Sequence, residues 1–448
     1  MKFLRKFFFP FSLVILIVLL FYTYYKSEIY WDGTKDNYYL AYYIVIIISI
    51  IFLSISFFLN NKIKDYLIIS IISIFISLYF CEGFLVFLKN NKEENFKTEF
   101  EKKKKIFKET TGHKYDIRSK YEIYEDLKKI DKDIKLSVSP NIFIREKYKL
   151  YPLSGISNSK TIHCNENGYY SIYQSDRYGF NNPDIEWDQK EIEYLLVGDS
   201  FTHGACVNRP KDIASVLRLL SNKSALNLGF SSNGPLIEYA TLREYLGSNV
   251  KKVLWMYYSN DIDNLANELT NDELKKYVED LNHTQNLKFF QNNLDNIGNT
   301  IIEKHYRTYK NKKPVIYFLK LNQVRTIVNK YLPFAFQPNP ILTSQPQTKL
   351  EFKKIIKMAK DLTLANGSQL YFIYIPGYYN YSQNFEDINY SFLKKVTKEL
   401  NIQFIDIHQE VLVNEKNPLE LFPFGFFGHY NEEGYKKIAE GIFYATQN

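Results

Sequence analysis

The chain has 448 residues, of which 46% are hydrophobic and 24% are charged, so it holds enough apolar material for more than one folded domain. Its formal net charge of +8 comes from 57 basic and 49 acidic residues, which suits an anionic envelope surface. No basic segment interleaved with aromatic residues is present, so the sequence does not indicate a nucleic acid as a partner.

Three N-terminal segments predict membrane-spanning helices. Phe7–Tyr25, Tyr38–Leu59 and Tyr66–Leu88 are almost free of charge, and each is long enough to cross roughly 30 Å of hydrocarbon. No small-residue cleavage site follows the first segment, so we expect it to remain as an anchor. Residues 1–88 are therefore predicted to form a membrane anchor of three transmembrane helices.

Basic residues before the first span and between the second and third place the N-terminus in the cytoplasm. Everything after the third span is then expected on the periplasmic or extracellular side of a bacterial inner membrane. The lysine-rich run Glu101–Glu109 favours the opposite orientation, but it precedes a long translocated domain, where the rule weakens. Glu82 lies inside the third span, within two turns of its outer end, and we expect its side chain to reach the interface.

Two segments of different composition follow the spans. Residues 89–136 are rich in lysine and glutamate, which is typical of a charged helical spacer. Residues 137–190 contain more Pro, Gly, Asn and Tyr, and predict short strands and turns packed on a main domain. Cys164 and Cys206 lie on the side predicted to be oxidising, and the sequence leaves open whether they form a disulfide. No C-x-x-C or histidine cluster predicts a metal.

From residue 191 to 448, short apolar runs alternate with amphipathic helical segments. The strand candidates are IEYLLVG, SALNLGF, KVLWMYY, QLYFIYI and IQFIDI. This alternation predicts a three-layer α/β/α domain with a parallel, flavodoxin-like sheet. A polar insertion over about 263–347 interrupts it, with a helix expected near LKLNQVRTIVNKYL and then the proline-rich FQPNPILTSQP. We expect an insertion of this size to cap a site at the strand ends.

Four stretches fall where such a sheet binds ligands, beyond the carboxyl ends of its strands. Ser200 stands in GDSFTHG after the first strand, and NLGFSSNG follows the second, with Ser232 and Gly234 in the loop. Asn260 stands in SND after the third strand, and His429 stands in GHYNEEGY before the last helix. Each stretch alone is weak evidence, but their order on the expected elements indicates a site built around a serine.

These four stretches resemble the sequence blocks of the SGNH/GDSL hydrolases, and the spans further resemble bacterial membrane-anchored members. The resemblance implies that Ser200 is a nucleophile activated by His429. The Ser200 amide, an amide of Ser232 or Gly234, and the Asn260 side chain would form the oxyanion hole. It implies no metal and no cofactor.

Asp199 and Asp261 flank these motifs and are expected in supporting roles. Asp199 is expected to be a buried acceptor for loop amides, and Asp261 to cap a turn. Asn431 is predicted as the N-cap of the last helix. His203 in the GDS loop is either a substrate contact or a surface histidine.

The sequence departs from the family at the carboxylate that usually stands two or three residues before the histidine. Those positions are Phe427 and Phe426, so His429 must be oriented by a backbone carbonyl, or by Glu420 or Asp406 from farther away. Ser259 also stands where glycine is usual, which keeps a small residue.

The resemblance, together with the predicted spans, implies a membrane-anchored serine esterase or O-acyltransferase, and by analogy with envelope members of the family we expect it to act on acyl groups, above all acetyl groups, of envelope glycans. An acylated glycan or another ester is then the substrate, and a membrane acyl donor is a candidate partner. A catalytically inactive envelope protein that binds glycan or partner proteins is the alternative, and the missing aspartate favours it.

Overall fold

The computed structural model describes all residues except 31–35, 147, 312, 332–344, 384–386 and 448. It divides into two compact units. The N-terminal helical unit comprises Met1–Phe100 and Lys312–Leu342, and the α/β unit comprises Glu101–Asn311 and Thr343–Asn448. The second half of the predicted insertion therefore groups with the N-terminal helices rather than with the sheet. The proline-rich stretch FQPNPILTSQP falls mainly outside the described residues.

Three long helices begin the chain. They are α1 (Lys2–Tyr24), continued by a π-helical segment over Tyr25–Tyr30, α2 (Asp36–Ser56) and α3 (Asn61–Thr111). Each contains a stretch long and apolar enough to cross a membrane, over Lys2–Tyr30, Tyr38–Ser56 and Asn61–Lys89. Most apolar side chains on these stretches are exposed, which is consistent with a lipid partner and membrane anchoring.

Helix α3 does not end with its apolar part. It continues into the predicted spacer as far as Thr111, and its last turns from Glu101 belong to the α/β unit. A short helix, α4 (Lys120–Lys128), follows, with Ser119 and Glu122 forming a capping box at its start.

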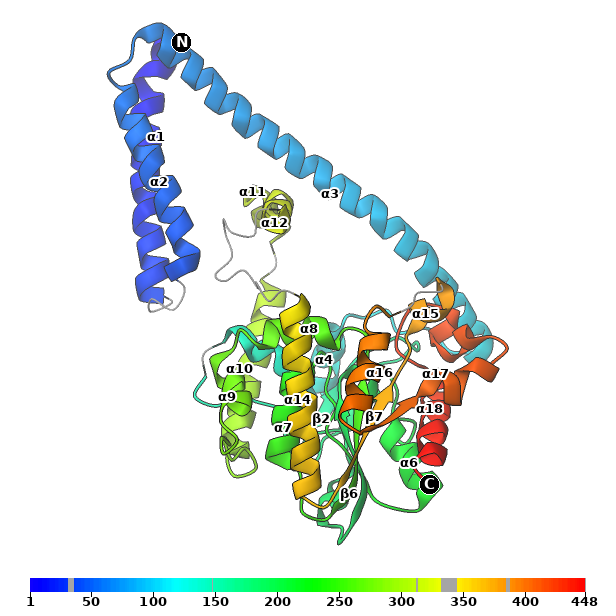
Figure 1. Cartoon of the computed structure of the whole chain (residues 1–448). Helices are drawn as coiled ribbons and strands as arrows, with labels where there is room; N and C mark the ends of the chain where they lie inside the picture. The colour runs from blue at the N-terminus through cyan, green and yellow to red at the C-terminus, as the bar shows by residue number, and fades with distance from the viewer. Residues whose placement is uncertain (31–35, 147, 312, 332–344, 384–386, 448) are drawn as a thin grey trace. The chain divides into compact units, whose positions relative to one another are not determined.

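The α/β unit is built on five parallel strands (Figure 1). They are β4 (Ile192–Gly198), β5 (Ala225–Asn227), β6 (Val250–Tyr257), β7 (Gln369–Tyr374) and β8 (Gln403–Asp406). Their order, β5-β4-β6-β7-β8, is the doubly wound arrangement of flavodoxin-like folds. The predicted strands and the predicted fold class are confirmed.

Helices cover both faces of this sheet. On one face pack α7 (Pro235–Tyr245), α14 (Gln345–Ala365) and α16 (Tyr390–Glu399), and on the other pack α6 (Ile213–Ser221) and α18 (Glu432–Ala445). Successive strand residues such as Trp255 and Met256 are therefore both buried, in different core clusters. This explains why the strands are continuous apolar runs rather than alternating ones.

The segment before the main sheet forms a small sheet of its own. Its strands are β1 (Lys135–Leu136), β2 (Lys160–Ile162) and β3 (Ile172–Gln174), with β2 in the middle. The Asn182 side chain joins the following loop to β5, because it exchanges two hydrogen bonds with the Asn227 backbone at 2.8 and 2.9 Å. Short 3-10 helices occur over Pro140–Arg145, Asp184–Asp188, Leu412–Asn414, Pro418–Leu421 and Pro423–Gly425.

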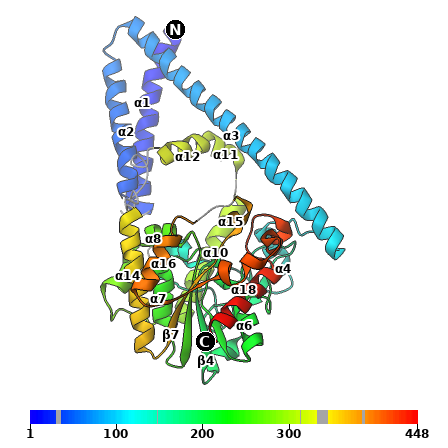
Figure 2. The ribbon, with the colours of Figure 1, turned by 45° about the vertical axis from the view of Figure 1, so that its right-hand side comes forward.

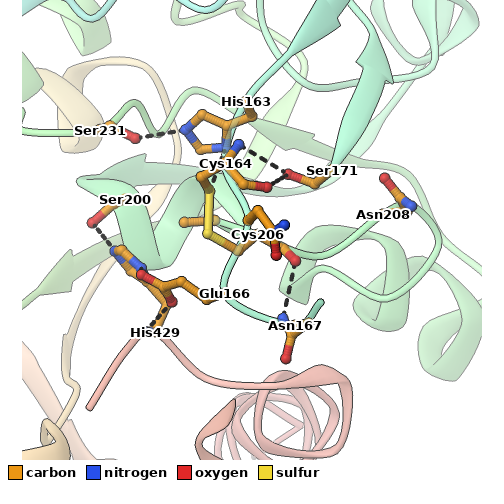
Figure 3. Close-up of a disulfide and its surroundings, with 12 residues drawn as sticks. His163, Cys164, Glu166, Asn167, Ser171, Ser200, Cys206, Asn208, Ser231 and His429 are labelled. Atoms are coloured by element: carbon orange, nitrogen blue, oxygen red, sulfur yellow. Dashed lines mark hydrogen bonds and ion pairs between the residues drawn. A yellow bond between two sulfur atoms is a disulfide. The ribbon is translucent and has the colours of Figure 1, made fainter. Parts of the chain in front are cut away.

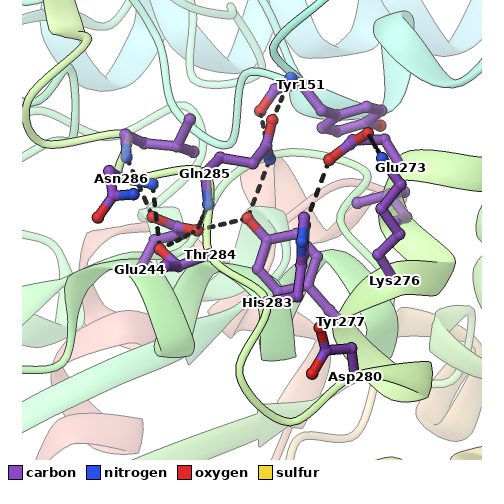
Figure 4. Close-up of polar contacts among 12 residues, drawn as sticks. Tyr151, Glu244, Glu273, Lys276, Tyr277, Asp280, His283, Thr284, Gln285 and Asn286 are labelled. Carbon is purple, nitrogen blue, oxygen red and sulfur yellow. Dashed lines mark hydrogen bonds and ion pairs between the residues drawn. The ribbon is translucent and has the colours of Figure 1, made fainter.

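The first half of the insertion belongs to the α/β unit. It contains α8 (Asp261–Glu268), α9 (Asp272–Glu279) and α10 (Gln291–Lys310), and both α8 and α9 contact α7. The Glu244 carboxylate on α7 fixes the chain after α9 (Figure 4). It accepts hydrogen bonds from the Tyr277 hydroxyl at 2.6 Å and from the Gln285 and Leu287 amides at 2.6 and 3.0 Å.

Candidate active site

Ser200 stands at the carboxyl end of β4, where it begins the short helix α5 (Ser200–His203). The Asp199 carboxylate caps this helix by accepting the Phe201 amide at 2.9 Å. The turn before it needs glycine, because a Cβ on Gly198 would lie 2.7 Å from the Met256 carbonyl oxygen. The buried strand ends in this way at a partly exposed serine.

His429 lies within hydrogen-bond distance of this serine. It precedes α18, whose N-cap is Asn431, as predicted: the Asn431 side chain accepts the Gly434 amide at 3.0 Å. His429 Nε2 lies 2.9 Å from Ser200 Oγ. Residues separated by more than two hundred positions thus meet as a serine and a histidine placed to accept its proton.

The carboxylate that orients His429 is Glu166, which the sequence analysis did not identify (Figure 3). Its oxygens lie 3.0 and 3.1 Å from His429 Nδ1, and one of them accepts the His429 amide at 2.6 Å. The carboxylates suggested from the sequence are engaged elsewhere. Asp406 caps the short helix α17 (Ile407–Glu410) and accepts the Tyr390 hydroxyl, and Glu420 accepts the Asn417 side chain. The carboxylate is missed because it comes from a segment outside the main sheet.

A disulfide holds the Glu166 segment beside the serine loop. Cys164 and Cys206 are bonded to each other with their Cα atoms 4.9 Å apart. Cys164 precedes Glu166 by two residues, and Cys206 follows Ser200 by six. The Asn167 side chain adds a hydrogen bond to the Cys206 carbonyl at 3.0 Å. Glu166 therefore sits on a loop fixed directly to the chain that follows the serine (Figure 3).

The last turns of α3 support the same loop. Gly168 has φ +90°, and a Cβ there would lie 2.5 Å from the Phe107 ring, so only glycine fits. Lys103 Nζ donates to the Phe427 carbonyl at 3.3 Å, two residues before His429. Residues of the predicted spacer thus contact both the loop that carries Glu166 and the loop that carries His429.

The charges at the site favour a base with a fixed tautomer. Burial alone would lower the pKa of His429, but the hydrogen bond and charge of Glu166 outweigh it and raise this pKa above 6.5. Burial in turn raises the pKa of Glu166, but the His429 contacts hold it below the ordinary 4.5. An ionised carboxylate only accepts hydrogen bonds, so Nδ1 carries the proton and Nε2 is left to accept the Ser200 hydroxyl proton.

The predicted supporting aspartates are structural acceptors. Asp199 is buried beneath the serine, and burial raises its pKa to about 6. Its carboxylate also lies 3.4 Å from Ser200 Oγ. Asp261 accepts the Tyr258 amide at 3.0 Å, which closes the turn between β6 and α8.

The predicted oxyanion donors differ in availability. The Gly234 amide donates to the buried Glu268 carboxylate at 2.6 Å, so Gly234 is not free to serve as a donor. Ser232 has φ +63°, and its carbonyl accepts the Asn141 side chain at 3.2 Å. Asn260 is the N-cap residue of α8, but its side chain makes no capping hydrogen bond. The Ser200 and Ser232 amides and the Asn260 side chain remain predicted donors.

His203 is neither a substrate contact nor a surface histidine. Its side chain is buried, and its ring lies 4.3 Å from that of His163 and 5.2 Å from that of Phe230. Burial lowers the pKa of His203 to about 3, so it is neutral. His163 Nε2 lies 2.9 Å from Ser231 Oγ and joins the small sheet to the loop after β5.

One group of side chains near the serine has the spacing of a metal site. Glu166, Cys206 and His429 each place a potential ligand atom within 4.8 Å of the others. The Cys206 sulfur is bonded to Cys164, however, and a disulfide sulfur is not the thiolate that binds metals. The group is therefore better described as a histidine, the carboxylate hydrogen-bonded to it and a disulfide beside them.

A cavity of about 540 Å³ lies farther along the same edge of the sheet, at the ends of β7 and β8. Tyr374, Tyr381, Asp387, Asp406 and His408 are among the residues that line it, and its described lining includes no lysine or arginine. The ring of Tyr379, on the short helix α15 (Tyr378–Ser382), stacks 5.0 Å from the ring of Phe427, on the loop before His429, and both side chains are exposed.

No protein-family model and no curated protein matches this sequence. Among solved structures, the chain is similar to a G-D-S-L family protein from Desulfitobacterium hafniense DCB-2, with 15% identity and a TM-score of 0.33 over 57% of this chain and 99% of that one. It is also similar to the acetyl xylan esterase AlAXEase, with 12% identity and a TM-score of 0.32 over 57% of this chain and 100% of that one. With so few identical residues and such low TM-scores, these similarities do not decide the activity. The strand order defines the fold, and the geometry of Ser200, His429 and Glu166 indicates the chemistry.

Proposed function

We propose that the protein is a membrane-anchored serine esterase or O-acyltransferase. The observation that supports this most strongly is the continuous chain of contacts from Ser200 Oγ to His429 Nε2 and from His429 Nδ1 to Glu166. A serine hydroxyl is a weak nucleophile until a base accepts its proton, and a carboxylate that holds the base stabilises the imidazolium that forms.

In this mechanism Ser200 Oγ attacks the carbonyl carbon of an ester while its proton passes to His429 Nε2. The amides of Ser200 and Ser232 and the Asn260 side chain stabilise the negative charge that develops on the carbonyl oxygen. His429 then gives the proton to the departing alcohol, and the acyl group stays on Ser200. Hydrolysis ends with water as the second acceptor, and transfer ends with a sugar hydroxyl.

We propose an O-acyl group, above all acetyl, on a cell-envelope glycan as the substrate. The cavity beyond β7 and β8 supports a neutral polyhydroxyl ligand, because tyrosines, carboxylates and a histidine line it without a described cation. The proposed location is the outer face of a bacterial inner membrane, with the N-terminus in the cytoplasm. A membrane acyl donor is a proposed partner for the transfer reaction.

The alternative of a non-catalytic glycan-binding protein depended on a missing aspartate. Glu166 supplies a carboxylate at His429 Nδ1, so this argument for inactivity no longer holds.

The test is labelling of the purified full-length protein by a fluorophosphonate probe. We expect the wild type to be labelled, and Ser200→Ala and His429→Ala to remain unlabelled. A folded wild type that takes no label would overturn the proposed chemistry. Incubation with an activated acetyl ester and a glycan acceptor then separates the two reactions: acetylated glycan means transfer, and free acetate alone means hydrolysis.

A further inference from the structure

The second half of the insertion forms two short helices, α11 (Pro314–Leu319) and α12 (Asn322–Tyr331), which follow one another in the chain (Figure 2). Both belong to the N-terminal helical unit, although the chain on either side of them belongs to the α/β unit. We propose that residues 313–331 are a re-entrant membrane element, which enters the lipid beside the third candidate span (Asn61–Lys89) and returns on the same side.

The depth of the contacts supports a position within the hydrocarbon. The Tyr79 hydroxyl donates to the Leu319 carbonyl at 3.0 Å, and the Tyr79 ring lies 5.9 Å from that of Phe318. Tyr79 precedes Leu88, the last apolar residue of the span, by nine positions, which is about 14 Å along a helix. The end of α11 thus lies against the middle of a segment whose hydrocarbon path is roughly 30 Å.

The backbone between the two helices meets the requirement for irregular structure at that depth. A helix break leaves peptide groups without partners, and in lipid these must be satisfied by protein. Glu82, 1% exposed, accepts the Gln323 amide at 3.0 Å and the Val324 amide at 2.9 Å. Tyr79 satisfies the Leu319 carbonyl before the break. Glu82 is therefore buried against the start of α12, which uses both of its oxygens, and on this proposal it does not reach the interface as expected from the sequence.

The side chains of α11 support the same conclusion. Five consecutive apolar residues, from Val315 to Leu319, are all exposed in the absence of lipid, Val315 by 69% and Leu319 by 57%. Lys313 and Lys320 stand at the two ends of this run. Helix α11 thus exposes apolar side chains on every side, and it contacts a candidate span. Both features are typical of a helix surrounded by lipid.

The crossing pattern of the spans agrees with re-entry. The second and third spans run in opposite directions through a membrane, so the start of α2 and the end of the third span lie at one face. The Arg325 side chain donates to the Tyr38 and Tyr42 hydroxyls near the start of α2, at 3.3 and 3.1 Å, while α12 begins at Glu82. Both contacts lie toward the face from which the chain continues to the α/β unit.

The experiment places a fluorophore on Val315→Cys in a Cys81→Ser background and reconstitutes the full-length protein in vesicles. Lipids with a nitroxide in the middle of the acyl chain quench only fluorophores that lie in the hydrocarbon. We expect strong quenching at position 315 and little at Ile130→Cys, an exposed site in the α/β unit. Equal, weak quenching at both positions overturns the proposal, including the case in which protein rather than lipid covers α11.

Three further variants test whether Glu82 and Tyr79 hold the element in place. Glu82→Leu removes both acceptors and is expected to lower the quenching at position 315, whereas Glu82→Gln keeps one acceptor oxygen and most of the quenching. Tyr79→Phe retains the ring contact with Phe318 and loses only the bond to Leu319, so it is expected to have a smaller effect. Quenching that is unchanged in both Glu82→Leu and Tyr79→Phe would show that these side chains do not hold the element. Neither readout depends on enzymatic activity.

Discussion

Ser200 and His429 come from the regular part of the fold, whereas Glu166 comes from a loop outside it. All strands of a parallel sheet end at the same edge. The alternation of strands and helices in the sequence therefore indicates where a serine and a histidine meet. The loop that carries Glu166 is not part of this alternation, and a disulfide and the end of α3 hold it at the site. Two of the three residues, Ser200 and His429, can therefore be recognised from sequence motifs, whereas the position of Glu166 depends on tertiary contacts.

The largest effect is expected where the regular part of the fold supplies the chemistry. Ser200→Ala and His429→Ala each remove a reacting group, and we expect kcat to fall by roughly 10⁵- to 10⁶-fold. Steady-state hydrolysis of an activated acetyl ester measures this. If kcat falls only tenfold in either variant, another residue performs the nucleophilic attack or the proton transfer.

Glu166→Gln tests whether the loop outside the sheet is equally part of the site. The amide keeps the size of the side chain but removes the charge and can favour the wrong tautomer of His429, so we expect kcat to fall on the order of 10³- to 10⁴-fold. Glu420→Gln, which changes a carboxylate near the histidine loop without a His429 contact, is the matched control and should retain activity. Equal activity of the two variants would remove Glu166 from the mechanism.

The disulfide is expected to matter through Glu166 rather than through chemistry of its own. Cys164→Ser frees the glutamate loop from the serine loop, and we expect kcat to fall about 10- to 100-fold through misplacement. The free energy of unfolding should fall on the order of 2 to 4 kcal/mol. Mild reduction of the wild type should reproduce the loss, whereas Cys81→Ser should have no effect. If Cys164→Ser reduces activity as much in a Glu166→Gln background as in the wild type, the disulfide does not act through the glutamate.

The smallest effect is expected in the pH profile. Neutral His429 is the active form, so activity should rise with pH through the pKa of His429, which Glu166 raises above 6.5. In Glu166→Gln this contribution is lost, and the acid limb of kcat/KM for the residual activity should move to lower pH. An acid limb that stays in place would mean that Glu166 does not set the pKa of the base.

Most of the α/β unit could be predicted from the sequence, because both-sided burial makes each strand an apolar run that a helix-length segment follows. The order of Ser200, Asn260 and His429 on these elements could also be predicted. Gly234 could not be excluded as a donor, since its amide is engaged by Glu268 from a helix outside the motif. His203 was misread because the small sheet that buries it has strands of only two or three residues.

One signal for Glu166 was present in the sequence. It is the only acidic residue between Glu146 and Asp176, and it lies two residues from a cysteine whose candidate partner follows the serine. A disulfide between Cys164 and Cys206 would have brought this one carboxylate to the serine loop. The sequence left that pairing open, and no spacing rule decides whether two cysteines meet.

The contacts of Lys103 and Phe107 have a practical consequence for where this chain can be cut. Composition sets a boundary near residue 137, after the lysine-rich stretch, and a soluble fragment designed on that basis would lack both side chains. The ring that closes over Gly168 and the ammonium group bonded to Phe427 would be gone, together with strand β1 and the core side chains Ile123, Tyr124 and Ile134, while the five-stranded sheet itself would remain. On the proposed function such a fragment would be a poor enzyme even where it folds, and its low activity would be mistaken for a missing substrate. Truncation should begin before Glu101.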